Sequence, residues 1–319
     1  MTAAGGASGS GLPTGAVVPL RVAGKLAVGP NGALYVADVG GDRVLARLTD
    51  GRFRVVAGNG KVGFSGDGGR AVDARLSGVS DLAFSPTGAL YIADVGRVRM
   101  IGRNGVIHTI AGDGRASKAV ADGTPALSAA LGSPHSIAVG GEGLSIAFSP
   151  RGQLYVSTGS QLLRLTAAGT LETVRAVATS GLVRGNLNGF GPIAIDSHGN
   201  IDVAGAFTGW SIWQVARNGV ARKVGFARQT GGDYATLERG PNGAVYGETE
   251  SSILRIDGLR LVPTFQFGFP LIHFAFGAHG TTYADDYAGG TAFEAHQQLV
   301  SVRNSHVSLL WQERNTTPR

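Results

Sequence analysis

Two stretches of near-identical sequence, Leu26–Asp38 (LAVGPNGALYVAD) and Leu82–Asp94 (LAFSPTGALYIAD), identify this chain as a repeat protein. Weaker copies begin at apolar residues that each stand six positions before a glycine: Ile146, Ile193, Leu237 and Phe274. The turn glycines of the six copies are Gly32, Gly88, Gly152, Gly199, Gly243 and Gly280. Six copies of one phrase predict six structural units of the same kind.

The segment that follows each turn glycine has the alternating pattern of a β-strand. Five copies carry a tyrosine three positions after the glycine, and the fourth copy departs from them with Asp202. The tyrosines are Tyr35, Tyr91, Tyr155, Tyr246 and Tyr283. Each unit has a second turn, at Asp50-Gly51, Asn104-Gly105, Ala168-Gly169, Asn218-Gly219, Asp257-Gly258 and Asn304-Ser305. Because Asp-Gly or Asn-Gly between apolar runs favours a hairpin, each unit is predicted to hold two hairpins, or four strands.

These units predict an all-β chain folded as a six-bladed β-propeller with four-stranded antiparallel blades. Each blade exposes two apolar faces that it cannot bury alone, and its neighbours in a ring cover them. We assign residues 20–312 to the propeller, residues 1–19 to a flexible N-terminal segment and residues 313–319 to a C-terminal tail. Residues 17–20 can add an outer strand to the last blade, whose third and fourth strands are expected in residues 297–312.

The composition agrees with this fold and excludes several classes of site. Of 319 residues, 43% are hydrophobic and 52 are glycine, so the chain can bury a core and has many turns. The absence of cysteine excludes disulfides and thiolate metal sites. No stretch approaches the roughly 20 apolar residues of a membrane span. The printed start lacks a signal peptide, which predicts a cytoplasmic protein unless the chain is a trimmed or mature form of an exported one.

Leu34–Asp38 and Leu90–Asp94 resemble the core of the NHL repeat. Ala57–Gly60, followed by Gly63–Gly69, resembles an insertion typical of bacterial and teneurin-like NHL propellers. The resemblance extends over residues 20–312 and is carried mainly by spacing in the fourth to sixth units. It implies a noncatalytic scaffold, expected to be a monomer, that presents its top face and channel mouth to a protein, glycan or small-molecule partner.

Two further segments, Gly29–Tyr35 and Arg99–Arg103, are similar to the repeats of streptogramin lyases. This similarity implies an alternative function, a metal-assisted lyase or a gluconolactonase-like hydrolase with its site at the central channel. Such enzymes need histidines and carboxylates that converge, and the sequence shows no fixed spacing of metal ligands. We therefore predict no cofactor, and a divalent metal stays open.

The candidate site follows from the topology of a propeller. The loop that enters the inner strand of a blade and the loop between its second and third strands lie on one side, which we call the top face. The central channel is expected to open on this face. The residue seven positions before each turn glycine is expected to point toward this channel mouth, and these residues are Lys25, Asp81, Ser145, Pro192, Thr236 and His273. We predict that the polar members of this set contact a ligand, with the loops after Val56 and Ala111 as its wall.

Two alternatives belong to this candidate site. In an enzyme, His273 would be the general base, because an imidazole titrates near neutral pH, and Asp81 would orient it or hold a metal. In the third unit, residues 134–139 are a second candidate inner strand, which would put Ser136 or His135 in the place of Ser145.

Two other polar segments have simpler interpretations. Asp285, Asp286, Glu294 and His296 are expected in the loop between the second and third strands of the last unit. We interpret them as a solvated acidic loop; the alternative is a Ca²⁺ or Zn²⁺ site, which requires that the four side chains converge. Ser65–Gly69 lacks the Lys-Ser/Thr ending of a phosphate-binding P-loop. We expect it to be a glycine turn in which Asp67 accepts hydrogen bonds from amides of its own loop.

The net charge of +6 arises entirely in residues 1–119. RNA binding by a basic face that includes Lys61, Arg70 and Arg75 is therefore a second alternative function. Recognition of single-stranded RNA also uses aromatic side chains for stacking, and Phe64 is the only aromatic residue in this basic loop. Nucleic acid is therefore not the expected partner.

Overall fold

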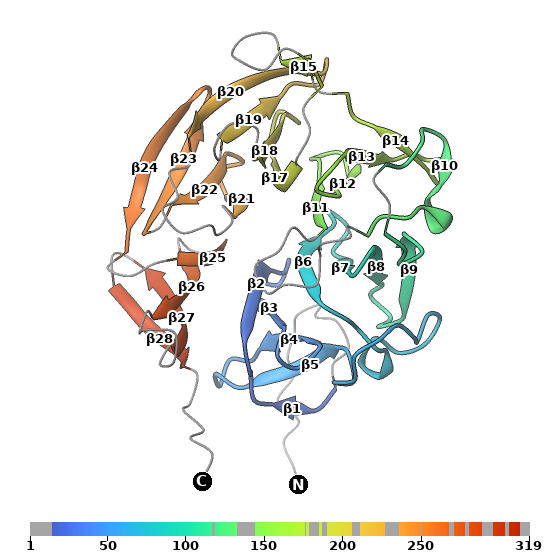
Figure 1. The fold of residues 1–319 in the computed structure, drawn as a ribbon. Helices are drawn as coiled ribbons and strands as arrows, with labels where there is room; N and C mark the ends of the chain where they lie inside the picture. Colours follow the sequence, from blue (N-terminus) through green and yellow to red (C-terminus); the bar gives the residue numbers. More distant parts are fainter. Residues whose placement is uncertain are drawn as a thin grey trace, which may run out of the picture.

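The chain forms six sheets arranged in a ring (Figure 1). This computed structural model describes residues 15–116, 119–132, 144–175, 177–178, 185–186, 190–205, 211–226, 236–249, 251–267, 271–277, 281–288, 296–303 and 306–312. The six-bladed all-β propeller expected from the repeats is confirmed.

In the first three blades, neighbouring strands pair antiparallel in chain order from the axis outward. Blade one comprises β2 (Ala23–Val28), β3 (Leu34–Asp38), β4 (Arg43–Arg47) and β5 (Phe53–Ala57). Blade two comprises β6 (Val79–Phe84), β7 (Leu90–Asp94), β8 (Arg97–Ile101) and β9 (Ile107–Ala111). Blade three comprises β11 (Ser145–Phe148), β12 (Leu154–Ser157), β13 (Leu162–Leu165) and β14 (Thr170–Thr173).

The last three blades repeat this order. Blade four comprises β17 (Phe190–Ile195), β18 (Ile201–Gly205), β19 (Ser211–Val215) and β20 (Val220–Phe226). Blade five comprises β21 (Leu237–Arg239), β22 (Val245–Thr249), β23 (Ser252–Asp257) and β24 (Arg260–Gln266). Blade six comprises β25 (Leu271–Phe276), β26 (Thr282–Ala288), β27 (His296–Arg303) and β28 (His306–Gln312).

Three sheets carry strands beyond these four, which the repeats did not indicate. β1 (Val17–Val18) joins blade one, β10 (Thr124–Pro125) joins blade three, and β15 (Val177–Ala178) with β16 (Gly185–Asn186) joins blade four. The expectation that residues 17–20 extend the last blade is wrong, because β1 pairs with β5 of blade one. Backbone hydrogen bonds between residues 15–16 and Val55 hold the segment there.

The ring closes by packing between blades one and six. The inner strands contact one another in order around the axis, and β25 contacts β2. Leu26 and Leu45 of blade one share an apolar cluster with Ala275 and Leu299 of blade six. In the part of the chain that the structure describes, the last sheet consists of β25 to β28 alone. Apolar burial therefore joins the first and last blades where no described strand is shared.

The turn glycines take the conformation that their position requires. Gly32, Gly88, Gly152, Gly199 and Gly243 all lie between the first two strands of their blades with φ between 75° and 84°. A side chain is strained at such angles, which explains the glycine. Gly280 lies outside the described residues.

The repeated tyrosines join consecutive blades. Tyr35 contacts Phe84 of the next blade with ring centroids 4.8 Å apart, and Tyr91 contacts Phe148 in the same way at 4.7 Å. Both pairs meet edge to face, a favourable geometry for aromatic rings. Tyr246 contacts Phe276 of the next blade with ring centroids 4.6 Å apart. This repeat position, which holds Asp202 in place of tyrosine in the fourth unit, is therefore a joint between neighbouring blades.

Two segments that connect consecutive blades also form hydrogen bonds to the outer strand of the following blade. They are Asp67–Ala71 and Asp122–Ala126, which we call the Asp-Gly clips. In the first clip, the amide of Gly68 donates to the Ile107 carbonyl at 2.8 Å, and the Asp67 carboxylate accepts the amide of Thr109 at 3.1 Å. Short 3-10 helices follow at Ala71–Asp73 (η1) and Ala126–Ser128 (η2).

Arg99 of β8 secures the first of these segments from within. Its side chain is 0% exposed, and it donates to the carbonyls of Ser65 and Arg75 and to the Asp67 carboxylate at 2.6 Å. The expectation that Asp67 binds amides of its own loop is therefore wrong: its two carboxylate oxygens contact Arg99 and Thr109, both in blade two.

Candidate functional site

The inner strands carry their polar residues at β-bulges. The pairing of the inner strand with the second strand shifts between Ala23 and Leu26, between Val79 and Asp81, and between Leu271 and His273. A bulge adds one residue to a strand and re-aims its side chain. The bulges therefore place Lys25, Asp81 and His273 at irregular points of the innermost strands of the ring.

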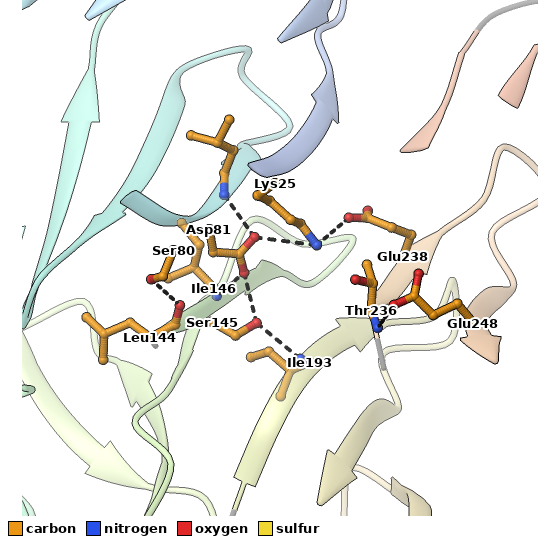
Figure 2. A network of polar contacts seen from close by, with 11 residues as sticks. Lys25, Ser80, Asp81, Leu144, Ser145, Ile146, Ile193, Thr236, Glu238 and Glu248 are labelled. Carbon is orange, nitrogen blue, oxygen red and sulfur yellow. Dashed lines mark hydrogen bonds and ion pairs between the residues drawn. The ribbon is translucent and has the colours of Figure 1, made fainter. Parts of the chain in front are cut away.

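Lys25 is the centre of a network of polar contacts that joins the inner ends of several blades (Figure 2). Its Nζ lies 2.6 Å from Glu238 Oε1 and 3.6 Å from Asp81 Oδ1, although the residue is only 9% exposed. Burial opposes the charge on Lys25, but Asp81 and Glu238 outweigh it and hold the pKa above its ordinary value. The ammonium group thus links blades one, two and five.

Asp81 extends the network to blades three and four. Its Oδ2 accepts hydrogen bonds from Ser145 Oγ and from the amide of Ile146, both at 2.8 Å. Ser145 Oγ in turn accepts the amide of Ile193 at 3.1 Å. Both oxygens of Asp81 are engaged, because Oδ1 also accepts the amide of Leu82 at 2.8 Å.

Blades five and six each hold a carboxylate against the start of the inner strand. Glu248 Oε1 accepts the amide of Thr236 at 3.0 Å, and Glu248 Oε2 is buried without a hydrogen-bond partner in the described part of the chain. Burial, with the charge of Asp285 added to it, raises the pKa of Glu248 well above its usual range. Asp285 accepts the amide of His273 at 2.7 Å.

His273 and Asp285 also form a side-chain pair, with His273 Nδ1 3.1 Å from Asp285 Oδ2. Asp285 is 0% exposed, whereas the side chain of His273 is 25% exposed. The orienting carboxylate expected in Asp81 is therefore Asp285 of the same blade. A histidine fixed by a buried carboxylate can accept a proton at its other nitrogen.

The structure brings Lys25, Asp81 and Ser145 into one set of direct contacts. Thr236 and His273 lie at the equivalent position of blades five and six. Glu238 and Glu248 were missed. Glu238 stands two residues after Thr236, on the same face of its strand, and Glu248 occupies the repeat position of Ala37. A carboxylate in place of an alanine was the available signal.

Other sequence-based candidates have different outcomes. Asp285 and Asp286 lie in β26, and His296 begins β27, so their expected place in a loop is wrong. Glu294, His135 and Ser136 lie outside the described residues, and Pro192 lies in β17. Within the described ranges, no three His, Cys, Asp or Glu side chains gather in a group that could hold a metal ion.

The basic loop before blade two presents an aromatic residue to solvent. Phe64 is 46% exposed and stacks against the guanidinium groups of Arg97 at 3.9 Å and Arg99 at 4.9 Å. Val62 beside it is 66% exposed. Lys61, Arg70 and Arg75 are also exposed in this loop.

This loop lies in a segment of the chain that matches a known protein family. Residues 52–119 match the family model of the teneurin NHL domain. Human Teneurin-1 is 37% identical over 100 residues, which cover 27% of this chain and 4% of that protein. Human Teneurin-4 is 38% identical over 94 residues, 25% of this chain and 3% of its own length. The resemblance to NHL-repeat propellers is confirmed.

Solved propellers resemble the whole chain in fold. A streptogramin B lyase matches 92% of this chain with 83% of its own, at a TM-score of 0.55 and 12% identity. A putative gluconolactonase matches 92% of this chain with 91% of its own, also at 0.55 and 12%. Identity this low shows the shared propeller alone. The described residues contain no helix with the length and hydrophobicity of a membrane span.

Proposed function

We propose that this chain is a noncatalytic recognition scaffold that binds a partner on its top face. The observation that carries the proposal is the exposure of Phe64. Phe64 lies on a loop held by backbone hydrogen bonds, and its ring stacks against Arg97 of β8. Exposed aromatic residues and arginines on rigid elements are typical anchors of protein interfaces. The teneurin NHL segment supports this proposal because it contains the loop.

The channel mouth supplies the second part of the proposed face. Glu238 and His273 are the partly exposed members, with side chains 23% and 25% exposed. Lys25, Asp81, Ser145 and Thr236 are buried behind them. A small polar ligand would therefore contact Glu238 and His273 first, with Lys25 keeping Glu238 in place and Asp285 keeping His273 in place.

A screen of protein and glycan arrays with the purified chain tests the scaffold. We expect binding partners whose signal falls at least about tenfold in the Phe64→Ala variant, as for an interface anchor. Leu259→Ala is the matched control, because Leu259 is 45% exposed in the turn between β23 and β24, on the opposite face. Partners that bind Phe64→Ala as well as the unaltered chain would contradict a top-face site at this loop.

A lyase or lactonase-like hydrolase is the second candidate, favoured by the pair of His273 and Asp285. His273 would accept a proton from the substrate while Asp285 holds the ring. Its fold relatives include a catalytically inactive virginiamycin B lyase variant from Staphylococcus aureus with Quinupristin, at a TM-score of 0.54 and 12% identity over 96% of this chain and 90% of that one.

Turnover assays separate this candidate from the scaffold. Quinupristin and a sugar lactone are incubated with the unaltered chain, with and without added divalent cations. An enzyme would lose at least about a hundredfold in rate on His273→Ala, as expected on removal of a general base. His108→Ala controls for loss of an exposed histidine on β9. Absence of turnover that depends on His273 would contradict the enzymatic function and leave the scaffold.

A further inference from the structure

The outer strand of a blade has one edge whose backbone groups need partners. The chain itself covers that edge in four blades. β5 pairs with β1, β14 with β10 and β20 with β15. The edge of β9 is covered by the first Asp-Gly clip, Asp67–Ala71.

The two clips use the same chemistry on different blades. In the second clip, Asp122 Oδ1 accepts the amide of Thr173 at 2.6 Å, and the amide of Gly123 donates to the carbonyl of Leu171 at 2.9 Å. The first clip makes the same pair of bonds to Thr109 and Ile107. An Asp-Gly step therefore recognises an outer strand through one amide and the carbonyl two residues before it.

Blade six offers the same two backbone groups on β28. Leu309 pairs with Val300 just before a bulge, as Thr109 pairs with Arg99 just before a bulge in blade two. Leu309 is therefore equivalent to Thr109, and Val307 to Ile107. By this register, the Leu309 amide and the Val307 carbonyl point away from β27.

No described segment pairs with the outer edge of β28. The connection before blade six, residues 267–270, joins Gln266 of β24 directly to Leu271 of β25 and is too short to reach that edge. Leu309 is 57% exposed, and Ser308 is also exposed. The sequence of β28, HVSLLWQ, has no Lys, Arg, Asp, Glu or Pro to protect it from pairing.

Blade five shows how the same position can be closed. Pro263 of β24 pairs with Leu254 just before the bulge, at the place of Thr109 and Leu309. Proline has no amide hydrogen, so β24 cannot donate to the carboxylate of a clip. Of the outer strands of blades five and six, β28 is therefore the one whose backbone can bind an Asp-Gly clip.

We propose that the outer edge of β28 binds an extended segment of a partner protein that carries an Asp-Gly step. The aspartate carboxylate accepts the Leu309 amide, the glycine amide donates to the Val307 carbonyl, and the segment adds a strand to blade six. The two clips of the chain itself identify this chemistry. The edge is separate from Phe64 and the channel mouth, so this proposal stands independently of the top-face function.

A synthetic peptide with the sequence of residues 119–128, titrated into the full chain, tests the proposal. We expect saturable binding and slower hydrogen exchange at the Leu309 amide. An otherwise identical peptide with Asp122→Asn should bind about tenfold more weakly, because a charge-assisted hydrogen bond becomes a neutral one. Equal binding of the two peptides, or exchange at Leu309 unchanged by saturating peptide, would overturn the proposal.

Variants of Leu309 separate the backbone from the side chain. Leu309→Pro removes the amide and should abolish binding, and blade five already accommodates Pro263 at this position. Leu309→Ala keeps the amide and should bind within about twofold of the unaltered chain. Loss of binding in Leu309→Ala alone would overturn the proposal. So would self-association that Leu309→Pro abolishes without any peptide binding, since a second copy of the chain would then occupy the edge.

Discussion

Two joints of the ring use the same repeat positions with different residues. The joint between blades one and two is aromatic, whereas the joint between blades four and five has ionisable residues at these positions. At the first joint, Tyr35 meets Phe84 edge to face. At the second, Asp202 stands in the place of the tyrosine and Arg239 in the place of the phenylalanine. Asp202 is nevertheless 0% exposed. A cluster that includes Ile212, Val224 and Leu237 packs there, so apolar burial keeps the ring together where the aromatic contact is absent.

Blade two adds a buried charge to its aromatic joints, and this charge should give the largest effect. Arg99→Ala removes the donor that binds Ser65, Arg75 and Asp67. It takes the paired cation from Asp67 and one of the two arginines that lie near Asp94. We expect a loss of about 3–5 kcal/mol in the free energy of unfolding, measured by denaturant titration. Arg103→Ala is the control, because Arg103 is exposed and binds the Thr87 carbonyl. A similar loss in both variants would contradict the role of burial.

The aromatic joint should come next. Tyr35→Ala removes a ring that is 3% exposed and opens a cavity against Phe84, so we expect a loss of about 3 kcal/mol in the free energy of unfolding. Tyr155→Ala at the joint between blades three and four is the counterpart. Tyr155 is half-buried and should cost less. Equal losses at the two joints would remove the distinction between them.

The polar joint should show a smaller effect of opposite sign. Burial raises the pKa of Asp202 to about 8, and Gln214 Nε2 donates to its Oδ1 at 3.1 Å. Since the folded pKa lies above the unfolded value near 4, the stability linked to this proton is complete below about pH 4 and is lost as the pH rises through 8. Asp202→Asn should therefore gain about 1–3 kcal/mol at neutral pH and flatten the dependence between pH 4 and pH 8.

Denaturant titrations across that pH range check the effect. The control is Asp122→Asn, since Asp122 is exposed and its pKa is lowered by the Thr173 amide. That variant should lose stability at neutral pH, which is the opposite direction. A pH profile of Asp202→Asn that superposes on that of the unaltered chain would show that Asp202 is ionised in both states.

The sequence predicted the features that depend on local interactions, and it missed those that depend on contacts between distant segments. The strands and the turn glycines Gly32 and Gly88 follow from alternation and local backbone angles, so their prediction holds in every described unit. Lys25, Asp81 and Ser145 were found because they share one register position in successive blades. Glu238 was missed because its contact with Lys25 crosses the ring, which no local pattern indicates.

The errors have the same cause. Asp67 was assigned to its own loop because local Asp turns are common, but its partner Arg99 lies in another strand. The strand at Val17–Val18 was assigned to blade six because ring closure was inferred without knowledge of which edge was free. Blade one offered that edge, on β5, and pairing between distant segments decided the outcome.

The smallest effect is expected at an exposed ion pair whose length matches that of the pair between the buried Arg99 and Asp67. Arg52 Nη2 lies 2.7 Å from Asp50 Oδ2, close to the 2.6 Å between Arg99 Nη2 and Asp67 Oδ1. The side chains of Arg52 and Asp50 are 66% and 45% exposed, whereas those of Arg99 and Asp67 are 0% and 39% exposed. Water and salt screen the exposed pair, and ordering two free side chains costs entropy that offsets its attraction. Arg52→Ala should therefore leave the denaturant midpoint unchanged at both low and high salt. A clear shift at low salt would show that distance outweighs burial in this propeller, and the comparison with Arg99 would then fail.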